Sequence, residues 1–264
     1  MPARPNALVT GASSGIGWEL AKLLAGDRYD LVFVARRGKK LEELGRDLTA
    51  AFGVQVKVIA KDLADQNAPS EVFAELQQAG LFINVLVNSA GFGVYGPFAR
   101  TERGKELEMI QVNVAALTDL TKLLLPAMLE RRSGKILNVA STAAFQPGPL
   151  MAVYYATKAY VLSFSEALAN ELAGSGVTVT VLCPGPTETQ FQKDAGLEET
   201  RLYKSPLLMD ARSVARAGYE GLKKSKRVVI PGLGNRLLVQ TERFTPRRLV
   251  TAIARKIQET RTSR

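Results

Sequence analysis

Short apolar runs that favour β-strands alternate with segments of helical periodicity along almost the whole chain. The strand-like runs are residues 7–10, 30–35, 54–60, 85–88, 135–140, 177–182 and 227–230. Several, such as LVFVA and VTVTVLC, are apolar throughout, which is typical of parallel strands buried on both faces. Helical patterns span residues 15–25, 39–51, 70–79, 102–131, 153–173 and 210–222. This order predicts right-handed βαβ crossovers and an α/β fold with a doubly wound sheet.

We expect a single domain over residues 1–264, because no repeat, low-complexity segment or linker divides the sequence. Two segments interrupt the alternation. The connection over residues 184–209 has the length of a lid or binding loop. The basic C-terminal extension over residues 233–264 contains a helix candidate at 246–260, in which Leu249, Ile253 and Ile257 form one apolar stripe.

Histidine is absent, and Cys183 is the only cysteine. These two facts exclude an intrachain disulfide, Ser-His-Asp and Cys-His catalysis, and multi-cysteine or His-ligated metal sites, so we expect no metal. Proton transfer near neutral pH must then come from Tyr, Lys, Asp or Glu with shifted pKa values. No signal peptide or uninterrupted membrane-length apolar run is recognisable, so we expect a cytoplasmic protein.

The net charge of +10 lies entirely in the C-terminal part of the chain. Residues 1–222 contain 23 Lys and Arg and 23 Asp and Glu, whereas residues 223–264 contain 12 Lys and Arg against Glu242 and Glu259. A neutral body with a basic tail argues against a nucleic-acid groove through the domain and indicates a local surface that faces an anionic partner. Nucleic-acid binding by the tail itself is the weakest alternative, because only Phe244 is available there for base stacking.

A glycine-rich turn, Thr10-Gly11-Ala12-Ser13-Ser14-Gly15-Ile16-Gly17, joins the first strand to the first helix. Such glycines let backbone N–H groups approach a diphosphate, and the helix N-terminus adds free donors. We therefore predict that a dinucleotide is bound by Gly11, Ser13, Ser14, Gly15, Ile16 and Gly17. A tight structural turn is the alternative. The G-x-S-x-G pattern of α/β-hydrolases also fits, with Ser13 as nucleophile, but it requires a histidine that the chain lacks.

The second strand ends in Arg36 and Arg37, and no acidic residue lies between Asp30 and Glu42. An enzyme that prefers NAD usually carries an acidic residue here for the ribose 2′-hydroxyl, whereas arginine accommodates a 2′-phosphate. The pair therefore favours NADP(H). The alternative is two arginines at the solvated start of a helix.

Tyr154 and Lys158 are four residues apart on a predicted helix and share one face. A free phenol has a pKa of about 10, and we expect the neighbouring ammonium to lower it. Tyr154 would then exchange a proton with a substrate carbonyl or alcohol, while Ser141 fixes the oxygen and Asn113 holds a water that links Lys158 to solvent. The adjacent Tyr155 has no lysine four residues further on.

The ordered set of motifs resembles the short-chain dehydrogenase/reductase family over residues 7–232. The motifs are Thr10-Gly11-x-x-x-Gly15-x-Gly17, Asp62, Asn88-Ser89-Ala90-Gly91, Asn113, Ser141, Tyr154-x-x-x-Lys158 and Pro184-Gly185. The resemblance implies a Rossmann-type, seven-stranded parallel sheet with helices on both faces, and a dehydrogenase or reductase that is a homodimer or homotetramer. It implies a catalytic tetrad of Asn113, Ser141, Tyr154 and Lys158. The choice of NADP(H) rests on Arg36 and Arg37.

The resemblance also implies contacts to the cofactor beyond the glycine turn and the arginines, from Asp62, Leu63, Asn88, Ala90, Gly91, Tyr154, Lys158, Pro184, Gly185 and Thr187. Asp62 would lie near the adenine, Asn88 at the cofactor backbone and Thr187 near the nicotinamide amide. Helix capping is the alternative role for these three residues. Ser89 stands where the family more often has a second Asn. A non-catalytic NADP-sensing regulator is the alternative function, but such proteins typically lose the Tyr or Lys that this chain keeps.

Candidate substrate contacts are mostly apolar or aromatic: Phe92, Val94, Tyr95, Phe145, Gln146, Leu150, Met151 and Phe191. They suit a hydrophobic ketone, aldehyde, steroid-like or 3-oxoacyl substrate, although several could be core residues. The C-terminal segment resembles a subgroup in which helices line the substrate entrance or touch a membrane. We expect residues 233–264 to form basic amphipathic helices that meet anionic lipid or an acidic acyl carrier, with a solvated cover or dimer contact as the alternative.

Overall fold

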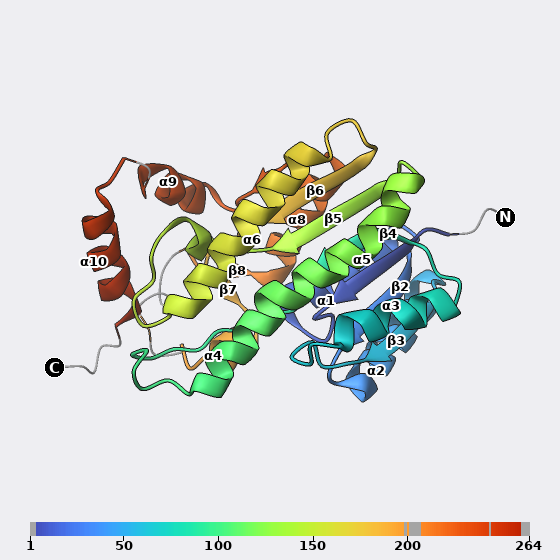
Figure 1. Ribbon diagram of the computed structural model, residues 1–264, viewed down its shortest axis with the longest axis horizontal. Helices are drawn as coiled ribbons and strands as arrows, with labels where there is room; N and C mark the ends of the chain where they lie inside the picture. The colour runs from blue at the N-terminus through green and yellow to red at the C-terminus, as the bar shows by residue number, and fades with distance from the viewer. Residues whose placement is uncertain (1–3, 198–199, 201–206, 243, 260–264) are drawn as a thin grey trace.

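The computed structural model describes residues 4–197, 200, 207–242 and 244–259 (Figure 1). Its main sheet is entirely parallel and has the strand order β3-β2-β1-β4-β5-β6-β9. The strands are β1 (Asn6–Thr10), β2 (Asp30–Ala35), β3 (Val56–Ala60), β4 (Ile83–Asn88), β5 (Gly134–Val139), β6 (Val177–Leu182) and β9 (Val228–Val229). The predicted α/β fold with a seven-stranded, doubly wound sheet is confirmed.

Helices cover both faces of the sheet, because successive side chains of a strand point to opposite sides. Ala7 and Val9 of β1 pack into one core with α1 (Gly15–Gly26), α2 (Gly38–Phe52) and α8 (Ala211–Lys223). Leu8 packs into a second core with α3 (Ala68–Gln78), α5 (Leu117–Glu130) and α6 (Ala152–Glu171). Burial on both sides explains why these strands are apolar throughout.

The helical run predicted for residues 102–131 consists of α4 (Arg103–Ile110), a π-helical turn η1 (Gln111–Ala116) and α5. The whole run is long and apolar enough to cross a membrane by length and composition, but 44% of its apolar window is buried inside the protein. Leu120, Leu124 and Met128 of α5 pack against the sheet, as in a core helix. The π-helical turn contains Asn113, and such turns occur frequently at functional sites.

Several short elements and the C-terminal helices complete the fold. They are η2 (Thr142–Phe145), β7 (Thr187–Glu188), α7 (Phe191–Asp194), β8 (Met209–Asp210), α9 (Leu233–Glu242) and α10 (Arg247–Gln258). The predicted connection over residues 184–209 thus carries structure of its own, since β7 and β8 form a small parallel pair. Part of that connection, and residues 243 and 260–264 of the predicted extension, lie outside the described residues. Figure 1 shows α9 and α10 at the end of the molecule towards which the strands point.

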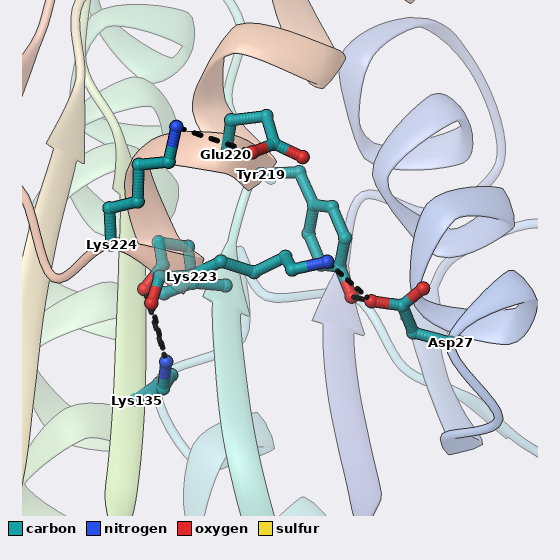
Figure 2. A network of polar contacts seen from close by, with 7 residues as sticks. Asp27, Lys135, Tyr219, Glu220, Lys223 and Lys224 are labelled. Atoms are coloured by element: carbon teal, nitrogen blue, oxygen red, sulfur yellow. Dashed lines mark hydrogen bonds and ion pairs between the residues drawn. The ribbon is translucent and has the colours of Figure 1, made fainter.

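A polar network joins α8 to α1 at the amino ends of the strands, on the side of the sheet away from α9 and α10 (Figure 2). Tyr219 Oη donates to Asp27 Oδ2 at 2.8 Å, and Lys223 Nζ lies 3.1 Å from the same oxygen. These contacts hold the pKa of Asp27 below its usual value. Lys135, at the start of β5, donates to the backbone oxygens of Leu222 and Lys223 at 3.3 and 3.1 Å. The network therefore lies at the amino ends of the strands, away from their carboxyl ends.

Candidate active site

A cleft of about 490 Å³ follows the carboxyl ends of the strands. It passes between β1 and β4, the neighbouring strands at which the strand order reverses, where ligands bind in doubly wound sheets. Thr10 Oγ1 accepts hydrogen bonds from the backbone N–H groups of Ser89 and Ala90, at 3.0 and 3.1 Å. This hydroxyl ties the ends of the two strands together beneath the cleft.

The glycine turn lines the cleft and has a backbone that favours glycine at two positions. Gly11 and Gly15 have φ angles of +68° and +57°. A Cβ atom on Gly11 would lie 2.8 Å from the nitrogen of Ala90, and one on Gly17 would lie 2.5 Å from the oxygen of Gly11. Ser14, the N-cap of α1, makes no capping hydrogen bond through its side chain within the described chain. The first N–H groups of α1 are therefore available to an anion.

The two arginines at the end of β2 also line the cleft. Arg37 Nη2 donates to Ser13 Oγ at 3.1 Å, which ties this guanidinium to the glycine turn. The Arg36 side chain is 67% exposed, and its Nη1 atom lies 4.0 Å from Glu108 Oε1. The structure thus brings two cations beside the glycine turn, as a 2′-phosphate would require.

Most of the other predicted cofactor contacts line the cleft: Asp62, Leu63, Ala90, Gly91, Tyr154, Lys158, Pro184, Gly185 and Thr187. Asn88 does not. Its side chain is buried behind the site, where Nδ2 donates to Asn138 Oδ1 at 2.9 Å and to Thr121 Oγ1 at 3.2 Å. Asn88 therefore links β4 to β5 and α5, and its side chain supports the floor of the cleft.

Ser141, Tyr154 and Lys158 lie together in the cleft although they come from two segments. Ser141 is the N-cap of η2, where Oγ accepts from the N–H of Ala143 at 3.1 Å. Lys158 is buried on α6, one turn after Tyr154, and its Nζ donates to the backbone oxygen of Val139 at 2.9 Å. Nζ lies 5.8 Å from the centre of the Tyr154 ring.

Burial governs the protonation of this group. It raises the pKa of Tyr154 to about 12, although a hydrogen bond with Ser141 acts in the opposite direction. Burial also lowers the pKa of Lys158 to about 8. The pKa of Tyr154 is thus raised in this structure and not lowered as expected, because removal from water favours the neutral form of the phenol. A phenol that keeps its proton at neutral pH is suited to donate it.

Asn113 lies behind the cleft and is 1% exposed. Its Oδ1 accepts from the N–H of Phe92 at 3.1 Å, and its Nδ2 donates to the Phe92 oxygen at 3.0 Å and to Thr157 Oγ1 at 3.1 Å. The side chain thus positions the segment after β4 against α6, and the water that Asn113 is expected to hold stays a prediction. A Cβ atom on Gly91 would lie 2.9 Å from Asn113 Oδ1, which explains the need for glycine there.

Four of the eight predicted substrate contacts line the cleft: Phe92, Gln146, Met151 and Phe191. The other four, Val94, Tyr95, Phe145 and Leu150, do not. Phe145 instead packs against a separate apolar cluster, and Tyr95 makes contact with α10. Five further apolar residues complete the wall: Leu197, Leu207, Leu238, Ala254 and Ile257. The last three belong to the C-terminal segment, whose helices the resemblance places at the substrate entrance, whereas Leu197 and Leu207 were not predicted.

One buried glutamine holds α10 against the site. Gln258 Nε2 donates to Tyr155 Oη at 2.5 Å, and the backbone oxygen of Gln258 accepts from Tyr95 Oη at 2.7 Å. Tyr155, which neighbours Tyr154 in sequence, is thus a partner of α10. Sequence spacing contains no signal for this contact, because residues 155 and 258 meet only through the tertiary fold.

Comparisons with known proteins agree with this arrangement. Residues 5–200 match the family model described as short chain dehydrogenase. A very-long-chain 3-oxoacyl-CoA reductase from Phaeosphaeria nodorum is 38% identical over 66% of this chain and 52% of its own length, so the chain spans about half of that relative. A ketoacyl reductase from Nostoc is 33% identical over 84% of this chain and 77% of its own. The structure of a short-chain dehydrogenase from Sphingobium yanoikuyae in complex with NADPH is 32% identical, with a TM-score of 0.82 over 91% of this chain and 93% of that one.

Proposed function

The chain belongs to the short-chain dehydrogenase family, and on that premise we propose that it is an NADP(H)-dependent reductase of a hydrophobic carbonyl compound. The observation that carries the proposal is the buried group of Ser141, Tyr154 and Lys158 in a cleft that also holds the glycine turn and two arginines. Among ketones, aldehydes, steroid-like and 3-oxoacyl compounds, a 3-oxoacyl thioester is favoured. One relative is named as a 3-oxoacyl-CoA reductase and another as a ketoacyl reductase.

The residues along the cleft suit NADP(H). The N–H groups at the start of α1 would hold the diphosphate, because the glycine turn lets the backbone approach it. Arg36 and Arg37 would pair with the 2′-phosphate, because a guanidinium group can donate two parallel hydrogen bonds to phosphate oxygens. Thr187, beside the predicted nicotinamide end, has its hydroxyl held by the Gly185 oxygen at 2.9 Å.

When bound, the reduced nicotinamide supplies the hydride to the carbonyl carbon. Ser141 Oγ donates a hydrogen bond that fixes the carbonyl oxygen, and Tyr154 transfers its proton to that oxygen. The high pKa of Tyr154 keeps this proton in place at neutral pH until it is needed. The Lys158 ammonium then stabilises the phenolate, and its pKa of about 8 lets it return a proton to Tyr154. Alcohol oxidation uses the same groups in reverse.

Replacing Tyr154 with phenylalanine tests the proposal. With a panel of hydrophobic ketones and a 3-oxoacyl thioester, followed by the absorbance of NADPH, we expect kcat of Tyr154→Phe to fall at least about a hundredfold. The dissociation constant for NADPH should not change. Tyr155→Phe is the matched control, because it removes a neighbouring hydroxyl and should keep kcat. Undiminished kcat in Tyr154→Phe would refute the mechanism, and NADPH binding without turnover of any carbonyl would favour a regulator.

A further inference from the structure

A carboxylate reaches the arginine pair from a different part of the fold. Glu108 of α4 lines the cleft, and its Oε1 atom lies 4.0 Å from Arg36 Nη1 at the end of β2. A carboxylate beside this strand end is the group that usually accepts a hydrogen bond from the ribose 2′-hydroxyl of NAD, and its charge repels a 2′-phosphate. The connection between β2 and α2 contains no acidic residue, so the tertiary fold supplies one from α4.

Glu108 has a second and closer cation. Lys105 lies one turn before it on α4, and its Nζ donates to Glu108 Oε2 at 2.7 Å. This distance is typical of a strong charge-assisted hydrogen bond, whereas the 4.0 Å to Arg36 is too long for one. The hydrogen bond raises the pKa of Lys105, and the charge of Arg36 acts in the opposite direction. The three charged groups therefore influence one another, and the lysine holds the carboxylate.

This arrangement leaves the Arg36 guanidinium available to the cofactor. At 4.0 Å, Glu108 Oε1 accepts no hydrogen bond from Arg36 Nη1. Without the lysine, the carboxylate would gain most by accepting two parallel hydrogen bonds from Arg36, which is the geometry that a phosphate group also uses. A carboxylate in that position competes with the 2′-phosphate of NADP(H) and offers an acceptor to the 2′-hydroxyl of NAD(H). The position of the Glu108 carboxylate thus affects which cofactor this end of the cleft favours.

We propose that Lys105 is a positioning residue that makes the cleft select NADP(H) over NAD(H), because it holds Glu108 away from Arg36. Lys105 does not line the cleft, so it acts through Glu108 and not on the cofactor directly. The inference rests on the proposed function for the identity of the cofactor but not for the carbonyl substrate. It adds two residues of α4 to a selection that sequence position assigns to Arg36 and Arg37 alone.

A double-mutant cycle with cofactor binding as the readout tests this role. Fluorescence titration at about 0.05 M salt gives the dissociation constants for NADPH and NADH in Lys105→Gln, in Glu108→Gln and in the variant with both changes. We expect Lys105→Gln to raise the NADPH constant about fivefold and to leave the NADH constant unchanged or lower. In the Glu108→Gln background, the same lysine change should alter the NADPH constant by less than about twofold, because the carboxylate through which it acts is gone.

Matched controls remove the same charges at other exposed positions. Arg103→Gln removes a positive charge from the same helix, and Glu43→Gln removes a carboxylate from α2, and neither residue lines the cleft. Both variants should keep the wild-type ratio of the two dissociation constants, which separates the contact between Lys105 and Glu108 from the general field of the protein. The effect of Lys105→Gln should also shrink at about 0.5 M salt, because salt screens exposed charges.

Three results would overturn the role of Lys105. One is an equal rise of both dissociation constants in Lys105→Gln, which would indicate a general structural effect. Another is an effect on NADPH that is the same with Glu108 and with Gln at that position, which would mean that the lysine attracts the phosphate directly. The third is an unchanged NADPH constant in Lys105→Gln. A wild type that prefers NADH would instead refute the proposed cofactor, whereas a preference for NADPH without coupling between the two residues would refute this inference alone.

Discussion

Arg36 and Arg37 differ in how they are held at the end of β2. Arg37 donates a hydrogen bond to Ser13, whereas Arg36 is largely exposed and its Nη1 atom lies 4.0 Å from Glu108 Oε1. Arg36→Asp should place a carboxylate where a 2′-phosphate would lie. We expect the dissociation constant for NADPH to rise about ten- to hundredfold and that for NADH to change far less. Fluorescence titration with both cofactors measures the two constants.

Arg46→Asp supplies the matched charge reversal, because Arg46 is exposed on α2 and does not line the cleft. It should leave both dissociation constants close to those of the wild type. If Arg36→Asp weakens NADH and NADPH equally, the arginine pair does not select the cofactor.

Lys158 should make the stability of the fold depend on pH. Its pKa is about 8 in the folded protein and about 10.4 in an unfolded chain. Between these values the unfolded state binds more protons, so the free energy of unfolding rises with pH. Burial of the ammonium therefore costs stability below pH 8, and the cost is relieved towards pH 10. Tyr154 acts in the opposite sense only above pH 10, because its folded pKa of about 12 exceeds that of a free phenol.

Urea unfolding of the wild type and Lys158→Met at pH 8 and pH 10 isolates this effect. The wild type should gain up to about 2 kcal/mol relative to the variant over that interval. Lys158→Met should also lose carbonyl reduction, since the ammonium that stabilises the Tyr154 phenolate is gone. A constant difference between the two proteins across the interval would mean that Lys158 is not desolvated.

At the scale of the element, Val250, Ala254 and Gln258 form the buried stripe of α10, and Gln258 adds hydrogen bonds to Tyr155 and Tyr95. Ala254 and Ile257 of the same helix line the cleft, so the position of α10 sets the substrate wall. Gln258→Ala removes the hydrogen bond to Tyr155. We expect KM for a bulky hydrophobic ketone to rise about five- to tenfold, while kcat changes little and the NADPH dissociation constant stays the same.

Thr251→Ala is the control on the same helix, because Thr251 does not line the cleft and its hydroxyl donates to the Arg247 oxygen within α10. Its steady-state constants should match those of the wild type. An equal fall in kcat for large and small ketones in Gln258→Ala would instead indicate that the hydrogen bond orients the reacting groups through Tyr155.

In the molecule as a whole, the carboxyl ends and the amino ends of the strands carry different features. The carboxyl edge holds the cleft and α10, whereas the amino edge holds the network of Asp27, Tyr219 and Lys223. The hydrogen bonds of that network join α8 to the end of α1, and none of these three residues lines the cleft. The separation allows the substrate end to vary while the sheet and its flanking helices stay intact.

Order and spacing along the chain were sufficient to predict the sheet, most of the helices and the position of the glycine turn. A strand that is apolar at every position must be covered on both faces, and four residues of helix bring Tyr154 and Lys158 onto one side. The ends of the elements shifted by only a few residues, as in β3, which begins at Val56 instead of residue 54. These features depend on local geometry, which is the same in every fold.

Properties that depend on contact between distant segments could not be predicted from the order and spacing of residues. The pKa of Tyr154 rises because residues from several elements exclude water from it, and no spacing within α6 shows that burial. Asn88 turns away from the cleft because Thr121 and Asn138 are its partners, and Gln258 reaches Tyr155 across more than 100 residues. The sequence alone determined the glycine turn and the order of the motifs. The protonation of Tyr154 and the wall of the substrate cleft depend on how distant segments pack together.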